Sequence, residues 1–384
     1  MSLVIAKRNF IRRILTMAKP IRVLQVIPQL GAGGISSVVM NWLREINSET
    51  VTFDFICFND GQYREELESL GCSVFLLPTF KSSPIKHVNE VNRIFNENTY
   101  DVIHVHNSFK NFVMLGLAKR HNIPVRVCHS HTSGLESTWL APVFGVIKQI
   151  TKSFSNQYVA CGDKAGKFLF GRDNFVVLNN AIKVEKFLPA EDKKQQYADV
   201  LKKYNLPTNK KLILHVGRFS TVKNHQFLLA LANNPLLGKD IHFVCVGDGP
   251  LKQDFAASIV ESRQSERFSL LPANDDIPQL LGGASAFIMP SLFEGVSVAL
   301  LEAQAAKLPC YISDTISLEA DMGLALVELL PLDSPEDWVQ QLNHLQPALL
   351  DDQMVKQAFN IKNYSIDAVT EQLIKLYKDG IEVS

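Results

Sequence analysis

Short apolar runs alternate with stretches of helical spacing along the first half of the chain. The apolar runs predict buried strands at 21–27, 73–77, 101–106, 125–128 and 157–161. Between them, helical periodicity predicts helices at 63–70, 87–96 and 112–120. Strands that alternate with helices indicate parallel β-α-β units, whose ligands gather at the carboxyl ends of the strands.

The second half of the chain repeats this pattern. Strands are predicted at 211–216, 241–246, 267–271, 286–289 and 310–312, and helices at 225–232, 277–281 and 296–306. A length of 384 residues favours two domains. The predicted units are a leader at 1–20, a first domain at 21–188, a charged linker at 189–210, a second domain at 211–364 and a final helix at 365–384.

Composition excludes several classes of protein. The formal net charge is zero and 46% of the residues are hydrophobic, which indicates a globular chain without an electrostatic preference for nucleic acid. No apolar run reaches the roughly 18 residues of a transmembrane helix. The cysteines lack CxxC spacing and sit mostly in apolar runs, which is typical of reduced core residues in a cytoplasmic protein. They are Cys57, Cys72, Cys128, Cys161, Cys245 and Cys310.

The first 20 residues leave two interpretations open. Residues 3–18 mix Leu, Ile and Phe with four cations, and most of the apolar residues share one face of a helical wheel. Such a segment could bind an anionic membrane surface. Alternatively, it is a leader before the first strand, and Met17 is the natural start. The segment lacks the long apolar core of a secretory signal, and we favour the leader.

The stretch 290–314 concentrates candidate chemistry. Glu294 lies in a turn between the strand at 286–289 and the helix at 296–306, where a helix N-terminus favours a phosphate. Glu302 follows eight residues later, about 2.2 helical turns, so both carboxylates could face one cleft. A carboxylate accepts vicinal hydroxyl donors of a sugar well. Taken alone, each glutamate is better explained by a structural role, Glu294 as a helix cap and Glu302 as an exposed helix residue.

A second turn, after the strand at 211–216, carries two cations. Gly217 and Arg218 begin this turn, and Lys223 stands five residues after Arg218 at the start of the next helix. Arginine forks onto phosphate oxygens and lysine adds a point charge, so the pair suits a diphosphate. Exposed cations are also commonly just solvated, and the spacing alone does not decide between the two.

The turn after the first strand is rich in glycine. Gly31, Gly33 and Gly34 allow a phosphate or a sugar to approach the backbone before a helix that begins near Ser36. The spacing matches the dinucleotide pattern G-x-G-x-x-G only in part. The acidic residue that a dehydrogenase needs after its second strand is also misplaced, because Asp54 precedes a strand predicted at 55–58. A turn that merely caps the helix is the alternative.

Histidines gather at the ends of two predicted strands. His106 ends the strand at 101–106, and His129 and His131 follow the strand at 125–128. One such histidine is usually a structural hydrogen-bonding residue, but several at neighbouring strand ends suggest a site. A His-x-His zinc site stays open as an alternative, although no carboxylate partner stands at ligand spacing.

Together these strings resemble one family. Glu-x7-Glu in 290–314, Gly-Arg with Lys-Asn at 217–224, and the pieces VCHSHTS and ACGDKAGKFLFG resemble the retaining glycosyltransferases of family 4. The resemblance covers about residues 20–380 and departs from the family pattern at Asn179 and Ala181, where a proline and a glycine are usual. It implies the GT-B fold: two doubly wound, Rossmann-like domains that face a cleft, with the last helix crossing back to the first domain.

The resemblance also implies roles for residues. It places Arg218, Lys223, Glu294 and His131 in catalysis, and His106 and His129 near the sugar or the acceptor. It assigns donor binding to Gly33, Gly34, Gly217, Glu294, Gly295, Val296, Ser297 and Glu302. No cofactor or metal is expected, because the nucleotide-sugar is itself a substrate.

The expected function is transfer of a sugar, more often from a UDP-sugar than from a GDP-sugar, to a glycan or a lipid-linked acceptor in exopolysaccharide or capsule synthesis. The expected location is the cytoplasm, with the first domain able to contact the inner face of the membrane. Two alternatives stay open: a sugar-nucleotide epimerase, which needs no acceptor, and a non-catalytic scaffold.

Overall fold

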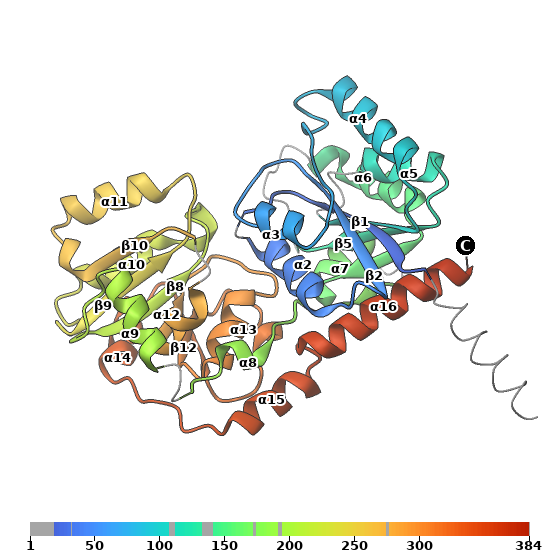
Figure 1. Cartoon of the computed structure of the whole chain (residues 1–384). Coiled ribbons are helices and arrows are strands. Elements are labelled where there is room, and N and C mark those ends of the chain that lie inside the picture. The colour runs from blue at the N-terminus through green and yellow to red at the C-terminus, as the bar shows by residue number, and fades with distance from the viewer. Residues whose placement is uncertain are drawn as a thin grey trace, which may run out of the picture.

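The computed structural model of the protein describes residues 19–31, 33–106, 112–132, 141–171, 174–190, 194–273 and 276–383. It consists of two lobes, each built on one parallel sheet with packed helices (Figure 1). The two doubly wound domains predicted from the sequence are therefore confirmed. The predicted leader falls almost wholly on residues 1–18, which lie outside the described residues.

In the first lobe, the described residues form one sheet with strand order β3-β2-β1-β4-β5-β6-β7. Its strands are β1 (Ile21–Ile27), β2 (Val51–Cys57), β3 (Val74–Leu76), β4 (Val102–His106), β5 (Val125–Ser130), β6 (Gln157–Ala160) and β7 (Val176–Val177). Its helices are α2 (Gly34–Glu45), α3 (Arg64–Ser69), α4 (Pro84–Glu97), α5 (Phe112–Arg120), α6 (Ala141–Phe154) and α7 (Asp163–Phe170).

Both faces of this sheet are covered by apolar side chains. Alternate residues of β1 belong to different core clusters, since Val23 packs with Trp42 of α2 and Leu24 packs with Leu115 of α5. A strand buried on both faces must be apolar along its whole length, which is why the sequence shows continuous runs here and not alternation.

The second lobe repeats the topology in its described residues, with strand order β10-β9-β8-β11-β12-β13. Its strands are β8 (Lys211–Val216), β9 (Ile241–Val246), β10 (Phe268–Leu271), β11 (Ala286–Met289), β12 (Cys310–Ser313) and β13 (Val327–Leu330). Its helices are α10 (His225–Asn233), α11 (Lys252–Glu261), α12 (Ile277–Gly283), α13 (Val298–Ala305), α14 (Pro335–Asn343) and α15 (Asp352–Ile361), with short 3-10 turns η4 (Thr221–Lys223), η5 (Ser265–Arg267) and η6 (Leu318–Ala320).

Each sheet reverses its strand order at one point. In the first lobe the reversal lies between β1 and β4, and in the second it lies between β8 and β11. Loops that leave such a pair diverge to opposite faces of the sheet and open a crevice where ligands bind. The glycine turn follows β1 and His106 ends β4, while Arg218 and Glu294 follow β8 and β11.

The described part of the segment predicted as a linker packs against the second lobe. It contains α9 (Lys194–Lys203), which packs against α12, and the short helix α8 (Val184–Phe187) precedes it. A Cβ atom on Gly282 would lie 2.3 Å from the ring of Tyr197, so glycine is what lets the two helices approach. Asp276 accepts hydrogen bonds from Lys203 and Tyr204 at 2.6 and 2.7 Å.

The last helix, α16 (Ile366–Val383), returns to the first lobe, as predicted. It runs from α15 beneath the second lobe to the edge of the first (Figure 1), where it contacts α2 and β5. A Cβ atom on Gly380 would lie 3.0 Å from Val125, and the Gln372 amide donates to the Val177 carbonyl. None of the described helices is long and apolar enough to span a membrane.

Asp54 has a different place from the one expected. It lies inside β2 rather than before it, because the strand starts at Val51. Its carboxylate accepts hydrogen bonds from Arg22 at 3.0 Å, the Tyr100 hydroxyl at 3.0 Å and the Ser73 backbone at 2.8 Å. The Asp54 carboxylate thus links three segments of the first lobe through hydrogen bonds. Because it is used in this way, it is unavailable to a ribose, which agrees with the argument from the sequence that the protein is not a dehydrogenase.

Candidate active site

In the second lobe, the turn after β8 packs against a second turn that contains glycines. Gly247 and Gly249 have φ angles of 151° and 157°, which disfavour other residues. A Cβ atom on Gly247 would lie 2.1 Å from the carbonyl oxygen of Gly217. Close backbone packing therefore fixes the turn that carries Arg218. Within the described part of the chain, the exposed Arg218 has no ion pair.

Lys223 and Glu294 form an ion pair that joins the turn after β8 to the turn after β11. Nζ of Lys223 lies 2.6 Å from Oε1 of Glu294, although the angles are not those of a hydrogen bond. The two side chains are only 17% and 14% exposed, so each charge depends on the other where water is scarce. The turns themselves are joined, because Leu292 N–H donates to the Val222 carbonyl at 2.8 Å.

The stem of Lys223 lies over Gly217. A Cβ atom on Gly217 would lie 3.0 Å from Cε of Lys223, so the predicted donor glycine makes room for the lysine. Asn224 has a left-handed backbone with φ of 53°, and its amide donates to the Pro290 carbonyl at 3.1 Å. The cation Lys223 and the carboxylate Glu294, both predicted from the sequence, are thus brought together.

Glu302 lies on α13 and faces a different neighbourhood. Burial raises the pKa of its carboxyl to about 7, and the nearby charge of Lys186 on α8 opposes this shift. Although part of the surface of Glu302 reaches solvent, no hydrogen bond within the described residues involves its carboxyl group. A carboxyl group with a raised pKa and no protein partner is typical of a ligand-binding position. Glu294, by contrast, lines a pocket between the lobes, and Glu302 is not among the residues of that pocket.

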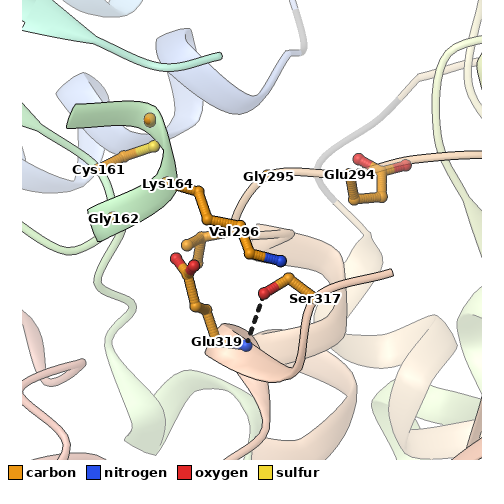
Figure 2. Close-up of a pocket in the computed structure, with 9 residues that line it drawn as sticks. Cys161, Gly162, Lys164, Glu294, Gly295, Val296, Ser317 and Glu319 are labelled. Carbon is orange, nitrogen blue, oxygen red and sulfur yellow. Dashed lines mark hydrogen bonds between the residues drawn. The ribbon is translucent and has the colours of Figure 1, made fainter. Parts of the chain in front are cut away.

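A pocket between the two lobes is lined by several of the residues predicted to bind the donor. Glu294, Gly295 and Val296 line it from the second lobe, opposite Cys161 and Gly162 at the start of α7 (Figure 2). A Cβ atom on Gly295 would also lie 3.8 Å from the backbone oxygen of His131. The acidic turn of one lobe therefore lies against the histidine segment of the other.

Sequence reasoning missed three residues of this interlobe contact. Asn180 donates to the Val296 carbonyl at 3.1 Å, and Glu319 approaches so closely that a Cβ atom on Gly162 would lie 2.4 Å from its Oε2. Lys164 also lines the pocket (Figure 2). Only Asn180 gave a signal, as part of the stretch that departs from the family pattern at its neighbours.

Ser297 caps α13 through its backbone rather than its side chain. Its hydroxyl contacts Sδ of Met289 at 3.5 Å, and both Val296 and Ser297 are buried. These two residues therefore offer a ligand little more than backbone groups. Donor binding by Val296 and Ser297, which the resemblance implies, stays a prediction.

The glycine turn of the first lobe is shaped by a neighbouring loop. A Cβ atom on Gly61 would lie 2.3 Å from the backbone nitrogen of Gly31, so that approach requires glycine. Gly33 precedes α2 with an extended backbone, and a Cβ atom on Gly34 would meet nothing within 4 Å. Gly34 is exposed at the start of a 12-residue helix, where unsatisfied N–H groups can face a ligand.

The histidines of the first lobe form a hydrogen-bonded group. The pairing of β4 with β5 sets His106 opposite His129. Nδ1 of His106 lies 2.8 Å from Nε2 of His131, and Nε2 of His104 lies 3.0 Å from Nδ1 of His129. His104, His106 and His129 are fully buried, while His131 reaches the surface in part. Sequence analysis missed His104, which points to the same side of β4 as His106.

Burial keeps all four imidazoles uncharged. Loss of hydration lowers the pKa of His131 to about 3, and lowers those of His104, His106 and His129 well below the usual value. His131 can therefore donate or accept a hydrogen bond at neutral pH but adds no positive charge.

The nitrogens of His104, His106 and His129 lie within 4.8 Å of one another, which raises the question of a metal ion. Imidazole lone pairs lie in the ring plane, yet the rings of His104 and His106 stack at 4.4 Å with an angle of 10°. Two parallel rings cannot both aim at one ion about 2.1 Å away. Their orientation therefore disfavours a shared metal.

Comparison with solved structures defines the class. HepE from Anabaena, solved with UDP and glucose, has a TM-score of 0.72 at 16% identity over 94% of this chain and 100% of that one. WaaG, a glycosyltransferase of lipopolysaccharide biosynthesis, has a TM-score of 0.67 at 13% identity, covering 92% of this chain and 99% of WaaG. The architecture is that of the GT-B glycosyltransferases.

Sequence comparison then defines the family. A family described as "Glycosyl transferases group 1" matches residues 210–346, and a "Glycosyl transferase 4-like domain" matches residues 33–160. The putative glycosyltransferase EpsF of Bacillus subtilis is 36% identical over 332 residues, 82% of this chain and 84% of EpsF. The chain belongs to the group 1 glycosyltransferases and is an enzyme of that type.

A second relative has a more specific description. It is the UDP-Gal:alpha-D-GlcNAc-diphosphoundecaprenol alpha-1,3-galactosyltransferase of Escherichia coli, which is 26% identical over 333 residues, 81% of this chain and 84% of that protein.

Proposed function

We propose that the protein is a retaining glycosyltransferase that moves a sugar from a UDP-sugar to a lipid-linked or growing glycan in cell-surface polysaccharide synthesis. The observation that carries the proposal is the Lys223–Glu294 ion pair, with the Lys223 stem over Gly217 and the next residue, Arg218, exposed and without an ion pair in the described part of the chain. The relative from E. coli, whose description contains both a UDP-sugar and a diphosphoundecaprenol, supports the choice of donor and acceptor.

The charges of the second lobe suit a departing nucleoside diphosphate. Breaking the bond between the anomeric carbon and the diphosphate leaves negative charge on a phosphate oxygen. Arg218 can fork onto that oxygen and Lys223 can add a point charge, without reorganisation of their turn. Glu294 positions Lys223 and can accept sugar hydroxyls, while Glu302 accepts hydroxyls of the ribose.

The acceptor enters from the first lobe. Its hydroxyl oxygen attacks the anomeric carbon on the face that the diphosphate leaves, and its proton passes to the departing phosphate oxygen. His131, uncharged and next to Gly295, hydrogen-bonds the sugar without competing for the phosphate. Gly33 and Gly34 leave space for the sugar or the acceptor at the start of α2.

The experiment uses the full-length protein with UDP-galactose, UDP-glucose and their N-acetyl forms, each with and without a GlcNAc-diphosphopolyprenol acceptor. We expect one donor to give a disaccharide only when the acceptor is present, with the α configuration of the donor kept in the NMR spectrum of the product. A β product would contradict retention. Conversion of the donor without acceptor would show an epimerase instead.

A further inference from the structure

A row of buried polar side chains runs from the crossing helix α16 to His131 at the cleft. Tyr377, Gln25, His104 and His106 have no exposed surface. The side chain of Tyr377 reaches β1 and β4 from a helix that is far away in the sequence. Polar groups so deeply buried are costly unless their hydrogen bonds are made, so their arrangement is informative.

On the cleft side, the row contains two bonds. Nε2 of His131 lies 2.8 Å from Nδ1 of His106. Nε2 of His106 lies 2.9 Å from Oε1 of Gln25. On the side of the helix, the Gln25 amide donates to the Tyr377 hydroxyl at 3.3 Å.

The amide oxygen of Gln25 determines which ring nitrogens of His106 and His131 carry a hydrogen. An amide oxygen only accepts, so Nε2 of His106 carries the hydrogen. His106 is uncharged, because burial lowers its pKa well below the usual value. Its Nδ1 is therefore bare and accepts the hydrogen of Nε2 of His131. His131 is uncharged as well, and so its Nδ1 is bare.

Tyr377 selects this orientation of the amide. Its hydroxyl lies 2.7 Å from Nδ1 of His104, a distance typical of an O–H donor and shorter than the usual N–H contact. With its hydrogen given to His104, the hydroxyl can only accept from Gln25, and accepting requires the NH₂ end of the amide. If the amide were turned, every proton in the row would move and Nδ1 of His131 would carry a hydrogen.

We propose that Gln25 and Tyr377 are positioning residues that fix the tautomer of His131, so that its bare Nδ1 accepts a hydrogen bond from a sugar hydroxyl in the cleft. The inference rests on the proposed function for the presence of the sugar. Among the described residues, no hydrogen bond uses Nδ1 of His131. The backbone oxygen of the same residue lies beside Gly295 of the donor turn.

The first test reads the tautomer directly. Long-range ¹H–¹⁵N spectra of the full-length, deuterated protein with ¹⁵N-histidine distinguish a bare ring nitrogen from a protonated one. Signals of His131 are assigned by their loss in His131→Asn. We expect a bare Nδ1 and a protonated Nε2 in the unliganded wild type. A protonated Nδ1 would overturn the proposal before any variant is made.

The second test changes the residue that sets the tautomer. Gln25→Met keeps length but removes the acceptor, so we expect both tautomers of His131 and a loss of about tenfold in kcat/KM, equivalent to about 1.4 kcal/mol. The affinity for UDP should stay within about twofold, because the nucleotide binds the other lobe. Gln25→Glu is the matched control, since its carboxylate still accepts from His106 and should preserve the tautomer and most of the activity.

Tyr377→Phe keeps the test decisive if Gln25→Met does not fold. It removes one oxygen far from the cleft and frees the amide to turn, so the second tautomer of His131 should appear. An unchanged His131 spectrum in whichever variant folds would overturn the proposal. If the wild type transfers no sugar from any UDP-sugar while the spectra behave as expected, the proposed function fails and the assignment of the tautomer stands.

Discussion

The two lobes share a topology, but the side chains at their candidate sites are charged in the second lobe and uncharged in the first. At the switch point of the second lobe, Arg218, Lys223 and Glu294 carry full charges on turns fixed by backbone packing. At the switch point of the first lobe, His106 and His131 are kept uncharged by burial.

This difference fits a division of labour in sugar transfer. A nucleoside diphosphate needs permanent positive charge, and arginine and lysine provide it at any physiological pH. A sugar or an acceptor hydroxyl needs directed hydrogen bonds, and a neutral imidazole provides one donor and one acceptor. A charged histidine would instead attract the diphosphate towards the wrong lobe.

The largest effect that follows is a loss of stability in acid. The buried histidines of the first lobe contribute to it together with His215 and His225 of the second lobe, whose pKa values burial lowers as well. Unfolded histidines take up protons as the pH falls through about 6.5, whereas the buried ones stay neutral, so the stability present above that pH is lost below it. Each histidine contributes about 1.4 kcal/mol per pH unit, and two of them over two units exceed about 5 kcal/mol. We expect urea unfolding between pH 7.5 and 4.5 to show this loss.

The direction in which pH changes the free energy of unfolding can be checked with two variants. His131→Asn removes one such group and should reduce the slope by about 1.4 kcal/mol per pH unit. Glu302 acts in the opposite sense, because its pKa is raised to about 7 when folded, so its contribution grows as the pH falls below 7. Glu302→Gln should therefore steepen the loss in acid. A free energy of unfolding that is flat from pH 7.5 to 4.5 would refute the neutral histidines.

The next effect concerns the unpaired cation of the second lobe. Arg218→Ala should lower kcat on the order of 100-fold or more, since it removes a group that stabilises the departing diphosphate. Stability should hardly change, because the side chain is exposed and has no ion pair within the described chain. Steady-state transfer assays measure the loss. Arg120→Ala, at the exposed end of α5, is the matched control, and equal rates in the two variants would contradict the clamp.

A smaller effect is expected at the partner of Lys223. Glu294→Gln keeps the shape but leaves the lysine without its counter-charge, and we expect roughly a tenfold lower kcat with some loss of stability. Lys223→Met removes the other member of the pair. In a double-mutant cycle the two changes should be non-additive, because each variant alone breaks the same pair. Additive losses would show that the two residues act separately.

The sequence predicted the second lobe better than the first. Its site consists of charged residues in turns between clear strands and helices, and the positions of Arg218, Lys223 and Glu294 follow from local spacing. Their ion pair did not follow, because Lys223 and Glu294 are 71 residues apart and lie in two separate turns.

The first lobe depends on contacts that no local pattern reveals. His104 reads as one more residue of an apolar strand, and its bond to Tyr377 joins positions 273 residues apart. Asp54 lies inside its strand and not before it, and only the structure shows the three donors that keep a carboxylate there. The role of Asn180 likewise depends on the opposite lobe, because its side-chain amide donates to the Val296 carbonyl.

The measurement that tests the division between the lobes most directly is thermal unfolding with and without millimolar UDP. At 100 times its dissociation constant, a ligand adds about 2.7 kcal/mol of stability. We predict that UDP stabilises the wild type and His131→Ala equally, and that Glu302→Ala loses most of the shift. If UDP fails to stabilise the wild type, or if His131→Ala abolishes the shift while Glu302→Ala keeps it, the assignment of the nucleotide to the second lobe is wrong.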